Sequence, residues 1–237
     1  QRPLESAPMN PNPMRKLSVR VLRLLATLAA VAPAGCIFPT LEKPPPAPPA
    51  VEAKAGRRLP PDTQVYELAN GLTLVVYESH ASPIVTIDTW VGTGSANETA
   101  ENNGVSHFLE HLLFKGGQKY GPRQVDRTLE SLGAQINAAT GDDSTHYYIT
   151  VAGRHIEQAL DVHADMLLHA ALPPKEVDAE RKAVIEEINR ANDSPQRKLY
   201  REMQKLLFRV HPYGLDTLGP PENIARIPRE TILEYYR

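Results

Sequence analysis

The five residues His-Phe-Leu-Glu-His, 107–111, lie in a segment, 104–115, whose apolar residues recur with helical spacing. Positions 107 and 111 are one helical turn apart, so the imidazoles of His107 and His111 project from the same face and can share one metal ion. The carboxylate of Glu110 lies beside them. Leucines in the same segment give the helix an apolar component, which places the histidine pair near a buried boundary. The stretch therefore predicts a helix that carries a metal site, and the alternative is a helix whose histidines merely line a polar surface.

A catalytic zinc ion takes three protein ligands and keeps one open position, so a further ligand must come from elsewhere. A second predicted helix, 174–192, carries two candidates, because Glu180 and Glu187 fall within its apolar stripe while Glu186 points away from it. A buried carboxylate is costly unless it is paired or bound to a cation. Both glutamates are therefore candidate partners of the ion, and the alternative is that they are solvated helix charges.

The pattern around these two helices predicts an α+β domain, with a mostly antiparallel sheet and helices packed on one of its faces. Asn70-Gly71 is typical of the turn of a hairpin. The predicted strands are 64–68, 72–79, 84–91, 134–140 and 144–152. The predicted helices are 104–115, 122–132, 155–171, 174–192 and 195–208, with shorter ones near the end.

Composition excludes several classes of function. With 26 Lys and Arg against 28 Asp and Glu, and no basic cluster, the chain lacks the positive surface with which nucleic-acid binders neutralise phosphates. Cys36 is the single cysteine, which excludes an internal disulfide and any thiolate catalysis in the domain. There is also no G-x-S-x-G nucleophile motif. Metal chemistry must rest on histidines and carboxylates.

The front of the chain, residues 1–36, reads as a leader and an export signal, in which basic residues precede a short apolar run, 24–32. The signal ends in Pro-Ala-Gly-Cys, which resembles a bacterial lipoprotein cleavage box, so we expect Cys36 to be lipidated. The alternative is an ordinary signal with an incidental cysteine.

A Pro-rich linker follows at 37–61, and the folded domain is expected at 62–237. The predicted location is the bacterial cell envelope, lipid-anchored and facing the periplasm.

The 107–111 stretch resembles the inverted zinc-peptidase motif of the pitrilysin, insulin-degrading enzyme and mitochondrial processing peptidase family. The likeness covers roughly 62–237. Further matching positions are Gly92 to Ser95, Phe114-Lys115-Gly116, Asn137-Ala138, Thr140, Asp143, Thr145, Tyr147, Glu180 seven residues before Glu187, His211 to Gly214, and Pro221 to Ile227.

This resemblance implies a zinc-dependent endopeptidase that hydrolyses short or unfolded polypeptides. One zinc ion would be held by His107, His111 and Glu187, with Glu110 activating a zinc-bound water. The resemblance also implies that Glu180 supports the site by orienting a ligand imidazole. Asn137 and Ala138 match the strand whose edge pairs with an extended peptide substrate.

The resemblance also implies a partner, because members of the family enclose substrate between two similarly folded halves. This chain would be the N-terminal half, ending before the last strand of its own domain, and the second half would lie downstream or on a partner subunit. Two alternatives stay open. One is a non-catalytic partner or scaffold subunit of the same fold, and the other is a lipid-tethered binding module in which a fourth protein ligand makes the zinc purely structural.

Overall fold

The computed structural model describes residues 59–237. The predicted signal peptide, Cys36 and nearly all of the predicted linker lie outside the described residues. Contacts divide the chain into two units, one ending at Ser82 and the other beginning at Pro83. Within the described range, no helix combines the length and apolar character that crossing a membrane requires.

The described part of the first unit is an antiparallel hairpin, formed by β1 (Thr63–Glu67) and β2 (Thr73–Tyr77). Gly71 has a φ of 85°, a conformation that glycine adopts without steric cost. The hairpin predicted from Asn70-Gly71 is therefore confirmed.

The second unit contains a three-stranded antiparallel sheet, in the order β3 (Ile84–Val91), β5 (Thr145–Ala152) and β4 (Gln135–Thr140). Every second residue of β5 is buried, beginning at Thr145, so one face of the sheet belongs to the core. Strand β5 pairs on both sides, whereas β4 pairs with β5 alone among the described strands. Strand β4 therefore has one edge with no strand paired to it in the described structure.

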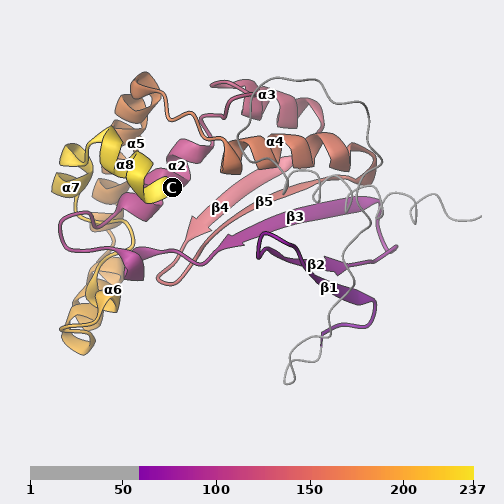
Figure 1. The fold of residues 1–237 in the computed structure, drawn as a ribbon. Coiled ribbons are helices and arrows are strands. Elements are labelled where there is room, and N and C mark those ends of the chain that lie inside the picture. Colours follow the sequence, from indigo (N-terminus) through magenta and orange to yellow (C-terminus); the bar gives the residue numbers. More distant parts are fainter. Residues whose placement is uncertain (1–58) are drawn as a thin grey trace, which may run out of the picture. The chain divides into compact units, whose positions relative to one another are not determined.

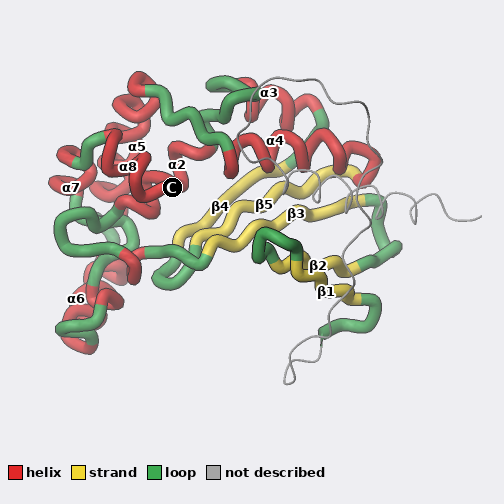
Figure 2. Tube along the Cα trace, viewed as in Figure 1, coloured by secondary structure: helices red, strands yellow, loops and turns green. Residues whose placement is uncertain are grey.

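Helices α3 (Gln124–Ser131) and α4 (Ile156–Leu168) lie side by side over one face of this sheet (Figure 1). Figure 2 shows the same separation of helices from strands. Their apolar side chains pack on the inward residues of β5. The fully or nearly buried members are Leu113, Val125, Leu129, Tyr147, Ile149, Val151, Ala159, Val162 and Met166. The predicted α+β class, with helices on one sheet face, is confirmed.

A second core joins α2 (Val105–Leu113) to α5 (Pro174–Asn192), α7 (Pro221–Arg226) and α8 (Arg229–Tyr236). Its members from these helices include Val105, Phe108, Leu112, Val177, Val184, Ile188, Ile224 and Ile232. Because Leu112 belongs to this core and Leu113 to the sheet core, α2 is fixed on two sides. The remaining elements are α6 (Pro195–Leu207) and the short 3-10 helices η1 (Ser95–Asn97), η2 (Gly153–His155) and η3 (Pro212–Gly214).

The segment before α2 is clamped against the tip of the β4–β5 hairpin. The backbone N–H of Ser95 donates to the carbonyl of Gly141 at 3.1 Å, and the Ala96 N–H donates to Asp142 at 2.8 Å. A Cβ atom on Gly94 would lie 2.4 Å from the Gly141 carbonyl oxygen. This contact is too close for any side chain, so glycine at position 94 is required for these two backbone hydrogen bonds, which we call the clamp.

Replacing Gly94 by Ala is expected to lower the free energy of unfolding by about 1–3 kcal/mol, since backbone must shift to relieve the clash. Gly92→Ala is the matched control, because a Cβ there meets nothing within 4 Å, and its effect should stay within about 0.5 kcal/mol. Urea denaturation of both variants measures the difference. Equal stability of the two would show that the clamp is not rigid.

Candidate metal site

Helix α2 begins in a tightly constrained turn. Gly104 has a φ of 97°, and a Cβ there would lie 2.7 Å from the Leu218 carbonyl oxygen, so both conformation and space require glycine. The buried carboxylate of Glu98 accepts the backbone N–H groups of Gly104 at 2.8 Å and Ser106 at 2.7 Å, and the Asn103 amide at 2.7 Å. A negative charge is favourable at a helix N-terminus. These bonds fix the start of α2 just ahead of His107.

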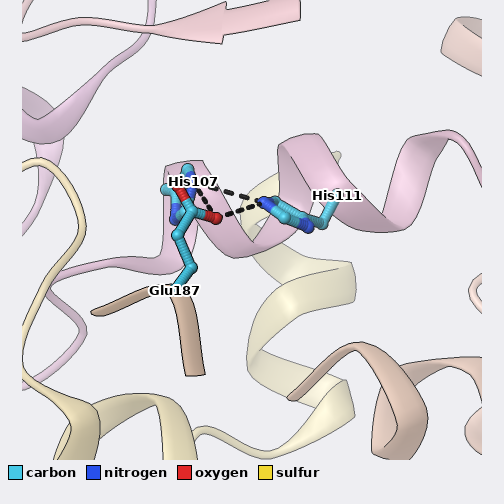
Figure 3. A group of neighbouring side chains, drawn as sticks. All are labelled: His107, His111 and Glu187. Carbon is cyan, nitrogen blue, oxygen red and sulfur yellow. Dashed lines mark hydrogen bonds and ion pairs between the residues drawn. The ribbon is translucent and has the colours of Figure 1, made fainter. Parts of the chain in front are cut away.

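Three side chains from two helices meet beside α2 (Figure 3). The Nε2 atoms of His107 and His111 are 3.3 Å apart. Glu187 Oε2, from α5, lies 3.6 Å from His107 Nε2 and 3.3 Å from His111 Nε2. The sequence placed these residues on two separate helices, and the structure brings their donor atoms together.

This donor set fits a tetrahedral zinc ion. Zinc ligands at about 2.0–2.1 Å from the metal stand about 3.3–3.4 Å from one another at the corners of a tetrahedron. The three distances, 3.3, 3.3 and 3.6 Å, lie close to that edge length. Two imidazoles and one carboxylate also match the ligand types of catalytic zinc sites, which leave one corner open.

The two histidines differ in their electrostatic surroundings. Burial and, to a smaller extent, the neighbouring His111 lower the pKa of His107 to about 4, against the opposing charge of Glu187. Burial also acts to lower the pKa of His111, but the Glu180 hydrogen bond and the charges of Glu187 and Glu110 outweigh it and raise that pKa. His107 therefore keeps a neutral ring, and the carboxylates around His111 favour positive charge at this position.

Glu180 contacts one of the two rings. Its Oε2 lies 3.2 Å from His111 Nδ1, and its Oε1 lies 2.7 Å from Lys115 Nζ. The His111 bond, opposed by burial and assisted by Lys115, lowers the pKa of Glu180. A proton on Nδ1 donated to this carboxylate leaves the lone pair of His111 Nε2 for a metal ion. The buried Nδ1 of His107, in contrast, has no hydrogen-bond partner among the described residues.

Removing the Glu180 carboxylate by Glu180→Ala is expected to weaken zinc binding about 10- to 100-fold, the usual cost of losing a group that orients a ligand. Asp178→Ala, an exposed site on the same helix, is the control and should bind as the wild type does. Competition titration with a chromophoric chelator measures both affinities. Unchanged affinity in the Glu180 variant would mean that packing alone orients His111.

Glu110 is half-buried on α2. The Thr140 hydroxyl donates a hydrogen bond to its Oε2. Burial raises the pKa of Glu110, and the Thr140 hydrogen bond and the charge of His111 oppose that rise. A carboxylate with a raised pKa is a stronger base at neutral pH.

The other predicted site residues occupy strand β4. Asn137 is exposed and Ala138 is partly buried, and both lie on the strand whose outer edge is unpaired in the described sheet. Asn137 Oδ1 accepts the backbone N–H of Ala138 at 2.9 Å. Cys36 lies outside the described residues.

Three residues that support the site or contact it have no role in the sequence-based prediction. Glu98 holds the start of α2, Lys115 contacts Glu180, and Thr140 contacts Glu110. Thr140 and Lys115 lie in segments that carry the family resemblance, which is the one signal that points to them. Glu98 gives no comparable signal, because an acidic residue in a polar loop is ordinary.

Comparison with known proteins identifies the family. The sequence profile described as Insulinase (Peptidase family M16) matches residues 74–221. The chain therefore belongs to the insulinase family, peptidase family M16.

Among its relatives, a Bacillus subtilis (strain 168) protein named "Uncharacterized zinc protease YmxG" is 35% identical over 170 residues, which are 72% of this chain and 42% of that protein. A solved protease from Helicobacter pylori superposes with a TM-score of 0.71 at 26% identity, covering 74% of this chain and 43% of that one.

The solved first half of the periplasmic protease PqqL from Escherichia coli gives a TM-score of 0.69 at 25% identity, covering 74% of this chain and 39% of that one. The chain spans 33–42% of the length of the first curated relatives that it matches. It thus corresponds to one portion of proteins that are considerably longer.

Proposed function

We propose that this chain forms the zinc-binding half of a metalloendopeptidase that hydrolyses peptide bonds in short or unfolded polypeptides. The observation that carries the proposal is the convergence of His107, His111 and Glu187 at tetrahedral spacing, with Glu110 on the same helix as the two histidines. Membership of the M16 family and a relative named a zinc protease support it.

The chemistry divides between the metal and the protein. Zinc in such a site supplies Lewis acidity, which acidifies a water molecule and polarises the scissile carbonyl. Glu110 accepts the proton of the attacking water and then gives it to the leaving amine, a role that its raised pKa favours. Glu180 keeps His111 oriented, and Glu98 keeps the start of α2 in place.

The open edge of β4 is the proposed substrate-binding strand. An extended peptide would add to this edge through main-chain hydrogen bonds, which explains tolerance of many side chains. The Ala138 N–H is bonded to the Asn137 side chain, so a substrate carbonyl would replace Asn137 Oδ1 as its acceptor. Asn137 thereby protects the edge from pairing with other chains while substrate is absent.

The proposal includes a second, similarly folded half as partner, since the solved PqqL fragment is described as the first half of its protein. A periplasmic location, with a lipid anchor at Cys36, is proposed from the predicted signal and from the likeness to PqqL, which is named a periplasmic protease. A non-catalytic scaffold or a purely structural zinc would not require a base beside three metal donors, so the arrangement favours the peptidase.

The direct test is cleavage of a quenched peptide by the complete protein, including its second half. We expect activity that a chelator abolishes and that about one equivalent of zinc per site restores. A complete, folded, zinc-loaded protein that cleaves no peptide would support the scaffold alternative. A fourth protein ligand seen by metal spectroscopy would support the structural one.

A further inference from the structure

Thr140 links the proposed substrate strand to the proposed base. It is the last residue of β4, two positions after Ala138, and its hydroxyl donates to Glu110 Oε2. The two residues are 30 positions apart in sequence and belong to a strand and a helix. The contact is therefore created by the fold and not by local sequence.

The Thr140 backbone is held firmly in place. Thr140 pairs with Thr145 in the β4–β5 register, and the Thr145 hydroxyl donates to the Thr93 carbonyl at 2.9 Å. The hairpin tip beyond it is closed by the Gly141 N–H donating to the Ser144 carbonyl at 2.8 Å. The hydrogen bond from the Ser95 N–H to the Gly141 carbonyl holds the same tip. Because its backbone is held in this way, Thr140 offers its hydroxyl as a hydrogen-bond donor at a fixed place in the fold.

The Glu110 side chain has no comparable restraint of its own. A glutamate rotates about three bonds, and ordering it costs conformational entropy. Among the described residues, Thr140 is the one hydrogen-bond donor to the Glu110 carboxylate, and it bonds Oε2. The other oxygen, Oε1, is left without a hydrogen-bond partner in the described structure. One oxygen is thus anchored while the other stays available.

We propose that Thr140 is a positioning residue, whose hydroxyl selects the Glu110 orientation in which the second carboxylate oxygen is available to the attacking water. Since Thr140 also ends the substrate strand, it places the base in register with the peptide bonded along β4. This inference rests on the proposed function and extends it to the placement of the base. Correct placement matters because an error of about 1 Å in a reacting group can cost about 100-fold in rate.

Two substitutions separate the hydroxyl from the shape of the side chain. Thr140→Val keeps the β-branched shape that suits a strand and removes the donor. We expect kcat to fall about 10- to 100-fold while KM and zinc affinity stay near the wild-type values. Thr140→Ser keeps the donor and should retain most of the activity. A purely structural role of Thr140 would give the opposite order, because valine fits the strand better than serine does.

Crystal structures of the zinc-loaded wild type and both variants supply a readout independent of activity. We expect one Glu110 orientation, bonded at position 140, in the wild type and the serine variant, and a displaced or multiple orientation in the valine variant. A wild-type structure in which Glu110 does not accept from Thr140, or a valine variant with Glu110 unmoved, would overturn the inference.

The kinetics distinguish this inference from the function on which it rests. A wild type that cleaves peptides, with a valine variant of equal kcat, would overturn the role of Thr140 and leave the peptidase intact. A wild type with no activity would count against the peptidase, and the Glu110 orientations in the three crystal structures would then decide the positioning role.

Discussion

Glu110→Gln is expected to bind zinc as the wild type does and to lose peptide hydrolysis by about 10²–10⁴-fold in kcat, the range supplied by a positioned general acid and base. Glutamine has the volume of glutamate and still accepts the Thr140 hydrogen bond, so the arrangement of α2 should persist. The glutamine amide cannot accept the proton of the attacking water, however. The variant should therefore lose hydrolysis and keep its fold and its zinc site. A quenched-peptide assay and zinc analysis on the same preparation measure the two properties.

The control for this substitution is Glu130→Gln, an exposed residue of α3 that contacts no part of the site. It should leave both zinc content and kcat unchanged. Two outcomes would contradict the role of Glu110. A glutamine variant that keeps most of its activity would exclude it as the base, and a variant that loses zinc would indicate that Glu110 is itself a ligand.

Glu187→Ala is expected to weaken zinc binding by more than about 100-fold. This loss of affinity exceeds the loss of about 10- to 100-fold that is usual when a residue hydrogen-bonded to a metal ligand is removed. The reason is that His107 and His111 alone offer two donors, whereas zinc sites of this kind use three from the protein. Loss of one carboxylate also removes negative charge from a partly buried cation site. Isothermal titration, or competition with a chelator, measures the change.

The neighbouring glutamate provides a close control. Glu186 is exposed and lies on the same turn of α5, so Glu186→Ala changes the charge by the same amount at nearly the same place. Its zinc affinity should stay within about twofold of the wild type, because exposed charges are screened by solvent and salt. Equal losses in the two variants would show that the effect is one of general charge and not of coordination.

Local periodicity accounts for much of what could be predicted. The i and i+4 spacing of His107 and His111 fixes them on one helix face whatever the rest of the fold. The apolar stripe of α5 separates Glu187, which faces the histidines, from Glu186, which faces solvent. Alternation and turn residues were likewise sufficient to locate the strands, since β3 spans the predicted residues 84–91 and the ends of the other four strands differ from the prediction by one or two residues at most.

Contacts between distant segments could not be read from such patterns. The role of Glu98 depends on how the chain turns before α2, where its carboxylate accepts the Gly104 N–H. The role of Thr140 depends on the end of β4 lying against Glu110 of α2. Residue type alone does not distinguish Glu98 from other acidic loop residues. From residue properties alone, Glu180 and Glu187 were equivalent candidates, and three-dimensional placement separates the one near His111 Nδ1 from the one near both Nε2 atoms. The expected lipidation of Cys36 stays a prediction.

Direct observation of the metal coordination is the strictest test of the proposed zinc site. A crystal structure of the zinc-loaded protein, with anomalous scattering at the zinc edge, should place one ion within about 2.0–2.2 Å of Nε2 of His107, Nε2 of His111 and a carboxylate oxygen of Glu187. An ion bound by any other set of residues, or a Glu187 carboxylate turned to solvent while the histidines hold the metal, would contradict the account.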